Sequence, residues 1–323
     1  MSAKPRPRVI ALEEHYQDPE LASHYAPGDG TRSPNIVSRL EDLGDERLKS
    51  MDAAGIDVQV LSHAQPATQK FDPETAVRLA RETNDRLHRS IQANPDRYAA
   101  FGILPTPDPK ASADELERCV TKLGFKGAMV HGLTHGRFLD EKEYWPIFER
   151  AQALDVPIYL HPGRPSEIVI DAYYKEYAKD YPHILGAGWG YTVEAATQAV
   201  RLVLSGALDA YPNVKFILGH FGEGLPFLLW RIDYSFSRPG NKPGLSFRDL
   251  FTEHFYLTTS GNFSDTALLC TVQEMGVERI MFSIDYPFVP NEPAWTEWMD
   301  RVALSADDKA KILSGNAERL LKL

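Results

Sequence analysis

The chain alternates short apolar runs with longer amphipathic stretches, and this alternation restricts its fold more than any other feature. The eight apolar runs are residues 8–15, 57–63, 98–105, 125–132, 156–163, 214–222, 254–261 and 279–287. Between them, apolar residues recur three and four positions apart, which is typical of helices that pack on a sheet. Strands that alternate with helices predict a parallel sheet. Eight such units in 323 residues predict an α/β fold, a single (β/α)8 TIM barrel, with residues 1–323 as one domain.

The composition argues against two classes of partner. The formal net charge is −10, whereas a nucleic-acid surface needs clustered lysine and arginine. No apolar stretch reaches the roughly 20 residues that cross a membrane, and no apolar signal-peptide region follows the basic N-terminus. The two cysteines, Cys119 and Cys270, lie far apart in predicted helices and indicate no disulfide framework. We therefore expect a cytoplasmic enzyme with no nucleic-acid or membrane partner.

Polar side chains gather at the carboxyl ends of the predicted strands, where a (β/α)8 barrel has its active site. They are Glu13, His15, His63, His131, His161, His220 and Asp285. Side chains along a strand alternate between its two faces, so Glu13 and His15 should both point into the barrel mouth. Glu14 should face the helical layer, where an arginine or lysine from a helix is its expected partner.

Four of these residues have the chemistry of a divalent-metal site. Glu13, His15, His161 and Asp285 offer two carboxylates and two imidazoles. This mixed set suits one Zn or Mn ion and leaves coordination positions for water or substrate. Taken alone, Asp285 could instead cap the turn before Pro287. Together, the four residues favour a metal site over a turn cap at Asp285.

Five segments also carry a family resemblance. They are "ALEEH" (11–15), "LHP" (160–162), "ILGHFGEGLPFLLWRID" (217–233), "TTSGNF" (258–263) and "RIMFSIDYPF" (279–288). As a set they resemble the amidohydrolase superfamily. The likeness is to its metal-dependent nonoxidative decarboxylase branch, which includes γ-resorcylate and 2,3-dihydroxybenzoate decarboxylases.

The resemblance implies a role for each site residue. The residues that match the branch's metal ligands are Glu13, His15, His161 and Asp285. His220 and Glu223 match a catalytic pair beside the metal, although Glu223 taken alone could be an exposed loop carboxylate. Arg231 matches an arginine that reaches a neighbouring subunit's active site, which implies a homo-oligomer, either a dimer or a tetramer.

The chain also departs from this branch near the expected substrate. His63 and His131 stand close to positions where the relatives carry asparagine. A lone histidine at a strand end is usually structural, but the loops that follow these two strands contact substrate in the family. His63, His131, Arg231 and Phe288 are therefore the candidate substrate-binding residues, with Phe288 as a wall for an aromatic ring.

The predicted reaction is nonoxidative decarboxylation of an ortho-hydroxybenzoate-type aromatic acid. The metal would chelate a carboxylate oxygen and the phenolic oxygen, Asp285 would protonate the ring carbon, and CO2 would leave. His220, oriented by Glu223, would hydrogen-bond the substrate or a bound water. The same ligand set also serves hydrolysis of a lactone, ester or amide, with Asp285 as the base. A metal-stabilised scaffold without activity is a third reading, and the open ligand set argues against it.

Overall fold

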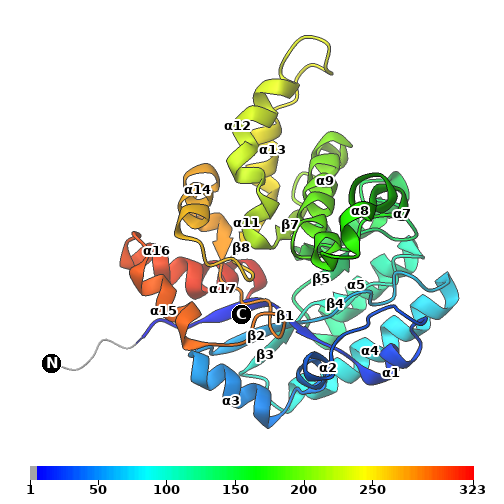
Figure 1. The fold of residues 1–323 in the computed structure, drawn as a ribbon, viewed down its shortest axis with the longest axis vertical. Helices are drawn as coiled ribbons and strands as arrows, with labels where there is room; N and C mark the ends of the chain where they lie inside the picture. The colour runs from blue at the N-terminus through cyan, green and yellow to red at the C-terminus, as the bar shows by residue number, and fades with distance from the viewer. Residues whose placement is uncertain (1–5) are drawn as a thin grey trace.

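All eight apolar runs form parallel strands in the computed structural model, which describes residues 6–323 (Figure 1). The strands are β1 (Ile10–Tyr16), β2 (Val58–His63), β3 (Tyr98–Ala100), β4 (Gly102–Ile103), β5 (Ala128–His131), β6 (Pro157–His161), β7 (Lys215–Leu218), β8 (Phe255–Thr258) and β9 (Ile280–Met281). The third run is divided between β3 and β4 at Phe101, because β3 pairs with β2 and β4 pairs with β5. The predicted strands are confirmed, and each is shorter than the run that predicted it.

The sheet closes into a ring between its first and last strands. Leu12 forms a parallel bridge with Ser283, and the Leu12 amide donates to the Phe282 carbonyl at 3.1 Å. Further along, the His15 amide donates to the Tyr286 carbonyl at 2.7 Å. The buried side chains inside the ring include Ile10, Leu12, Val60, Phe101, Met129, Ile217 and Met281. The predicted TIM barrel is therefore confirmed.

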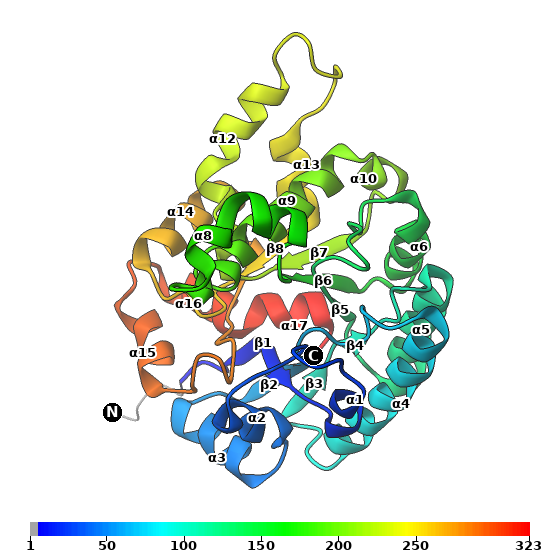
Figure 2. The same cartoon turned by 45° about the vertical axis from the view of Figure 1, so that its right-hand side comes forward.

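Helices follow the strands, and most of them cover the outside of the barrel (Figures 1 and 2). The longer ones are α3 (Asp45–Ala54), α4 (Pro73–Gln92), α5 (Pro109–Leu123), α6 (Trp145–Leu154), α9 (Gly190–Leu204), α12 (Leu225–Phe236), α13 (Phe247–His254), α14 (Asp265–Met275) and α15 (Pro293–Arg301). The others are α1 (Pro19–Ser23), α2 (Pro34–Glu41), α7 (Glu167–Val169), α8 (Lys175–Ala178), α10 (Ala207–Ala210), α11 (His220–Glu223), α16 (Ala306–Ala310) and α17 (Asn316–Leu321).

Helix α4 shows how the sequence sets such a helix. The Asp72 side chain accepts a hydrogen bond from the Thr75 amide at 3.0 Å and caps the first turn. Its buried residues include Ala76, Leu79, Ala80, Thr83, Leu87 and Ile91, which recur at helical spacing on the face that meets the barrel.

At the other end of the chain, Leu320 and Leu321 of α17 pack into the same apolar cluster as Ile10.

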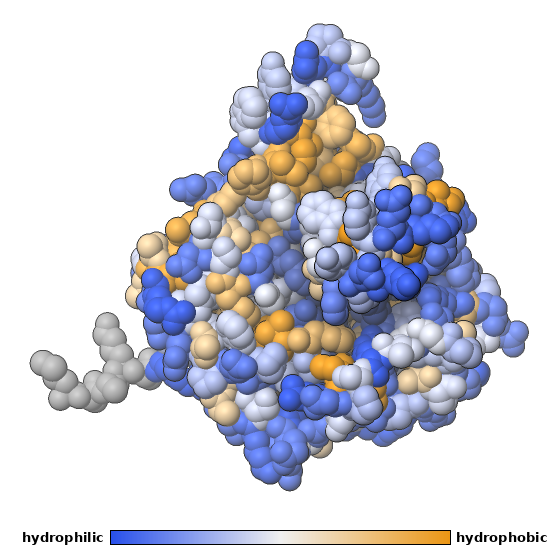
Figure 3. Space-filling view, viewed as in Figure 1, coloured by the Kyte–Doolittle hydropathy of each residue, from blue (hydrophilic) through white to orange (hydrophobic). Residues whose placement is uncertain are grey.

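Helices α12 and α13 project from the barrel as a hairpin (Figures 1 and 2). Residues 237–244, the most loop-like segment of the sequence, lie at its tip. Large apolar side chains on α12 are exposed, including Phe227 at 82% and Trp230 at 64%, and Figure 3 shows an apolar patch over this hairpin. Within residues 6–323, no helix combines the length and the apolar character that crossing a membrane requires.

Candidate metal centre and active site

The four predicted metal ligands converge at the carboxyl end of the barrel. Glu13, His15, His161 and Asp285 each offer one ligand atom, and these four atoms lie within 4.8 Å of one another. His161 Nε2 is 3.4 Å from Glu13 Oε1, and His15 Nε2 is 3.4 Å from Asp285 Oδ1. Strands β1 and β6 and the segment after β9 supply them.

The hydrogen bonds around the centre turn its ligand atoms inward. His161 Nδ1 contacts the Pro162 carbonyl at 2.7 Å, and His15 Nδ1 contacts Ser62 Oγ at 3.2 Å, so each Nε2 is left for the centre. Within the described chain, Glu13 Oε1 and His15 Nε2 are buried without a hydrogen-bond partner. Buried polar atoms are normally paired. A divalent cation, which accepts lone pairs from carboxylate and imidazole, fits these atoms.

Glu13 reaches the centre through an irregular stretch of β1. The register of β1 with β2 shifts between Ala11 and Glu14, and Glu13 has a φ of 59°. Glu13 and His15 point to the same side, as predicted, but they do so across a bulge and not along a regular strand. The Tyr159 hydroxyl donates to Glu13 Oε2, and a Cβ at Gly219 would lie 2.5 Å from that oxygen. Glycine is required at position 219 for this close approach.

Glu14 points away from the centre, as predicted, but its main partners are not a helical arginine. Its Oε1 accepts from the Ile284 amide at 2.8 Å, and its Oε2 accepts from the Tyr286 amide at 3.3 Å. These amides stand on either side of Asp285, whose φ is 72°. Gln59 Nε2 also donates to Glu14 Oε2 at 3.3 Å. Glu14 thus holds the backbone that presents the Asp285 ligand.

A buried arginine completes this arrangement. Arg47 of α3 donates from Nε to Gln59 Oε1 at 2.8 Å and from Nη2 to the His15 carbonyl at 2.7 Å. It lies near Glu14 without hydrogen-bonding it directly. Burial raises the pKa of Glu14 to about 8 even though Arg47 and the two amides act to lower it.

Glu14→Ala is expected to lower the free energy of unfolding by about 2–4 kcal/mol, because it leaves two buried amides unpaired. Glu14→Gln is the matched control. It keeps an oxygen for the Ile284 amide and loses only the acceptor that serves the Tyr286 amide, so it should cost clearly less than Glu14→Ala. Urea unfolding of both metal-free variants measures this difference. Equal losses in the two variants would contradict the clamping role of Glu14.

The second predicted pair, His220 and Glu223, lies beside the metal ligands. His220 Nδ1 is 2.8 Å from Glu223 Oε1, and His220 Nε2 is 3.9 Å from Asp285 Oδ2. Glu223 is buried, so it is not an exposed loop carboxylate. Both residues of the pair have positive φ values, 50° and 56°. Such backbone strain in non-glycine residues is typical of functional sites.

The charges place a proton on His220. Burial lowers the pKa of His220, but the neighbouring carboxylates, Glu223 first among them, hold it well above its usual value. Burial raises the pKa of Asp285, but contacts with His15 and His220 lower it to about 2. Without a bound cation, His220 is therefore the protonated member of the contact with Asp285.

Comparison with known proteins settles the family. A family model described as "Amidohydrolase" matches residues 23–323. The chain belongs to the amidohydrolase family. A γ-resorcylate decarboxylase of Rhizobium radiobacter is 40% identical over 328 residues, covering 97% of this chain and 98% of the relative.

Solved structures agree with this membership. A 2,6-dihydroxybenzoate decarboxylase complexed with 2,6-dihydroxybenzoate matches with a TM-score of 0.88 and 39% identity, over 98% of this chain and 100% of the other. A dihydroxybenzoic acid decarboxylase of Polaromonas sp. JS666, with bound manganese and 2-nitroresorcinol, matches with a TM-score of 0.88 and 40% identity, over 98% of both chains. The predicted resemblance to the decarboxylase branch is confirmed.

A cavity of about 950 Å³ opens over the metal centre of this amidohydrolase. Its lining includes three of the metal ligands, the catalytic candidate His220, and two of the four predicted substrate-binding residues, His131 and Phe288. The His131 ring meets that of His161 edge to face, with centroids 4.7 Å apart. Within the described chain, His131 Nδ1 is buried and has no hydrogen-bond partner. His131 and Phe288 are thus placed to contact a substrate.

The other two predicted substrate-binding residues lie elsewhere. His63 Nδ1 contacts the Ala64 carbonyl at 2.6 Å, and its Nε2 accepts from the Asp18 amide at 3.0 Å. Burial lowers the pKa of His63 to about 4, so its ring is neutral and both nitrogens are occupied. His63 therefore has a structural role, and we correct its assignment. Arg231 is exposed on α12 and does not line the cavity of its own chain.

Two residues of the site escaped the sequence analysis. Tyr159 lies two positions before His161 on β6, so strand alternation places both on one face, and this spacing was the available signal. Arg32 lines the cavity from the segment between α1 and α2. That segment carries no periodic pattern, and no sequence signal pointed to it.

Proposed function

We propose that this amidohydrolase is a metal-dependent nonoxidative decarboxylase of an ortho-hydroxybenzoate-type aromatic acid. The observation that carries the proposal is the convergence of Glu13, His15, His161 and Asp285, of which the last three line a cavity of about 950 Å³. A cavity of this size is suitable for an aromatic acid. The relatives named γ-resorcylate and 2,6-dihydroxybenzoate decarboxylases support the same reaction.

One divalent ion, Mn or Zn, would be held by the four ligands, and when bound it supplies Lewis-acid stabilisation of the substrate's oxygen atoms. Manganese in the Polaromonas relative supports this choice of ion. The protein residues supply the proton. Direct loss of CO2 would leave an aryl carbanion that is too basic to form at neutral pH, so the ring carbon must be protonated first.

Asp285 is the residue that we assign to this proton transfer. Its Oδ2 lies 3.9 Å from His220 Nε2, so His220 is placed to resupply the proton after each turnover. Glu223 fixes the orientation of the His220 ring through the 2.8 Å contact at Nδ1. A general acid held in this way contributes typically about 10²–10⁴-fold to the rate.

Hydrolysis of a lactone, ester or amide is the alternative, because it uses the same ligand set. The manganese-loaded protein should be incubated with salicylate, 2,6-dihydroxybenzoate and a panel of lactones. We expect CO2 release from at least one aromatic acid and no ring opening of the lactones. Lactone opening without any CO2 release would refute the decarboxylase and favour the hydrolase.

The predicted homo-oligomer belongs to this proposal. Phe227, Leu228, Trp230 and Tyr234 expose apolar surface on α12, and the rings of Trp230 and Tyr234 stack 5.2 Å apart. An exposed apolar patch on a projecting helix is typical of a protein interface, and a second copy of the chain can pair with it across a two-fold axis. Arg231 on the same helix would then face the partner. The cytoplasmic location stays a prediction.

Trp230→Glu is expected to shift the protein from an oligomer to a monomer, because it buries a charge in the proposed interface. Light scattering measures the mass in solution. Ile168→Glu is the matched control, since Ile168 is as exposed as Phe227, at 82%, but lies on α7. If the wild-type protein is only monomeric, the proposed homo-oligomer and the role of Arg231 in a neighbouring site are both refuted.

A further inference from the structure

A single peptide unit links the metal ligand His161 to a buried carboxyl group. His161 Nδ1 lies 2.7 Å from the Pro162 carbonyl, and because a carbonyl oxygen can only accept, the ring donates there. The amide of the same unit, the N–H of Gly163, donates to Glu194 Oε2 at 3.0 Å. Resonance holds the atoms of a peptide unit in one plane. Glu194 therefore holds the group that receives the hydrogen bond of His161.

Glu194 reaches this peptide from the buried face of α9. Glu194, Gln198 and Leu202 are buried at intervals of four residues along that helix. Glycine after β5 leaves the space that the carboxyl group occupies, because a Cβ at Gly132 would lie 3.2 Å from Glu194 Oε2 and 2.7 Å from Gly163 Cα. The ends of β5 and β6 thus meet α9 at this hydrogen bond.

The burial of Glu194 is costly, and no cation compensates it. Among the residues that the structure describes, Glu194 forms no ion pair, and its Oε1 is buried without a hydrogen-bond partner. Burial, together with the nearby carboxylate of Glu223, raises the pKa of Glu194 to about 8, although the Gly163 amide acts to lower it. Buried polar atoms are normally paired, so an acid kept at this cost indicates a role beyond folding.

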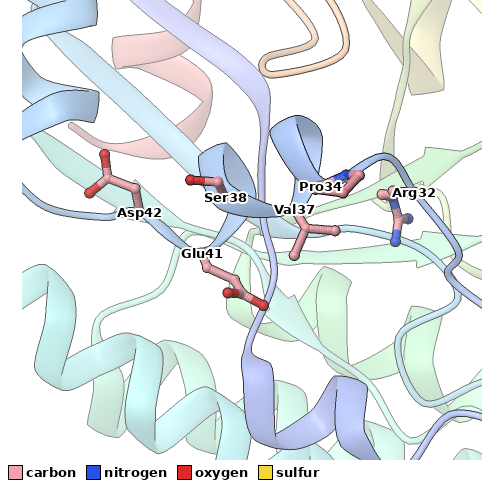
Figure 4. A pocket seen from close by; sticks show the side chains of 6 residues that line it. All are labelled: Arg32, Pro34, Val37, Ser38, Glu41 and Asp42. Carbon is pink, nitrogen blue, oxygen red and sulfur yellow. The ribbon is translucent and has the colours of Figure 1, made fainter.

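That role does not involve contact with the substrate. Glu194 lies outside the cavity of about 950 Å³ over the metal centre. It also lies outside an outer hollow of about 700 Å³, which is lined by Arg32, Pro34, Val37, Ser38, Glu41 and Asp42 (Figure 4). The path from Glu194 to the metal centre therefore runs through the peptide between Pro162 and Gly163.

We infer that Glu194 is a positioning residue for the metal centre, which acts on His161 through the Pro162 carbonyl. This inference rests on the metal centre of the proposed function and adds a residue outside its ligand set. The Glu194 oxygen fixes the peptide, and the peptide carbonyl fixes the His161 ring with its proton on Nδ1. Nε2 then keeps its lone pair for the ion. Hydrogen bonds in such a chain polarise one another, so the carbonyl also becomes a stronger acceptor.

The test is the affinity for manganese, measured by titration calorimetry on metal-free protein whose fold is checked by far-UV circular dichroism. Glu194→Ala should weaken binding by about tenfold. Groups that hydrogen-bond a metal ligand typically contribute about 10–100-fold, and Glu194 acts one peptide further out, so the lower end is expected.

Two further variants separate the reach of Glu194 from its charge. Glu194→Gln keeps an oxygen for the Gly163 amide and should recover most of the affinity. Glu194→Asp keeps the carboxylate but is one methylene shorter, so it should bind manganese as weakly as Glu194→Ala. If Glu194→Ala does not fold, the comparison of Glu194→Gln with Glu194→Asp decides.

Gln198→Ala is the matched control on the same face of α9. Gln198 Oε1 accepts from the Leu139 amide at 3.4 Å, and within the described chain its Nε2 is buried without a hydrogen-bond partner. Gln198 thus resembles Glu194 in both respects, but Leu139 is not next to a metal ligand. Gln198→Ala should lower the stability of the apo protein, measured by urea unfolding, and leave the manganese affinity unchanged.

The outcomes separate this inference from the proposed function. Wild-type affinity in both Glu194→Ala and Glu194→Asp would show a merely structural role, and would overturn the inference while leaving the decarboxylase standing. Equal weakening in Glu194→Gln and Glu194→Asp would also overturn it, because the acceptor at Gly163 would not be the cause.

Two results concern the proposed function itself. A wild-type protein that binds no manganese would overturn both the metal centre and the role of Glu194. Weak manganese binding in Glu194→Ala and Glu194→Asp, recovered in Glu194→Gln, with no CO2 release from any aromatic acid by the wild type would support the positioning role and refute the decarboxylase.

Discussion

Asp285→Asn is expected to reduce kcat by at least about 10³-fold, because it weakens a metal ligand and removes the proposed proton donor. An amide cannot hold and release the proton that the ring carbon needs. The fold should persist, since Asp285 is only partly buried and lies at the barrel mouth and not in the apolar interior. Steady-state CO2 release and far-UV circular dichroism measure the two effects.

The control for Asp285→Asn is Glu223→Gln, which leaves the four ligands intact. Glu223→Gln removes the carboxylate that raises the pKa of His220, so it should slow turnover less and shift the pH profile. Metal content must be measured for each variant, so that loss of the ion is distinguished from loss of the acid. Wild-type turnover in metal-loaded Asp285→Asn would remove Asp285 as the proton donor.

His161→Ala is expected to weaken binding of the divalent ion by at least about 100-fold, because even partners outside the ligand set typically contribute 10–100-fold. The Nε2 of His161 faces Glu13 Oε1 at 3.4 Å, so the substitution removes the ligand atom beside Glu13. Bound metal should stabilise the wild type by about 2.7 kcal/mol at a metal concentration of 100 Kd. His161→Ala should gain almost none of this at the same concentration.

His254→Ala is the matched control for His161→Ala. His254 is also buried, but its Nδ1 contacts the Val214 carbonyl at 2.8 Å, and both residues directly precede strands, at the end of the barrel opposite the metal ligands. It should therefore keep the metal-dependent gain in stability even if the apo protein is less stable. Thermal unfolding without manganese gives the stability of the apo protein, and the difference with manganese gives the metal-dependent gain. An undiminished gain in His161→Ala would exclude His161 from the metal centre.

The fold and the metal ligands could be predicted because they depend on periodic patterns. A strand that is covered by helices must be apolar, so Glu13, His15 and His161 stand out at the ends of such runs. The parallel order of the strands then brings ends that are far apart in sequence to one rim. No knowledge of individual contacts was needed for this step.

The remaining features depend on tertiary contacts and backbone irregularities that have no sequence signature. The bulge at Glu13 and the positive φ of Asp285 arise from tertiary contacts, and they determine what Glu14 binds. Both nitrogens of His63 are taken by backbone groups that only the folded chain brings near. Arg32 lines the cavity from a segment without periodicity, so its place there follows from geometry alone.

The central claim is that Glu13, His15, His161 and Asp285 hold one divalent ion that decarboxylation requires. The most direct test strips the protein with a chelator and titrates manganese back, while elemental analysis counts bound ions and CO2 release from the aromatic acid is recorded. We expect activity to disappear on stripping and to return in proportion to bound metal, reaching its maximum near one ion per chain. Undiminished CO2 release from protein with no detectable metal would contradict the claim.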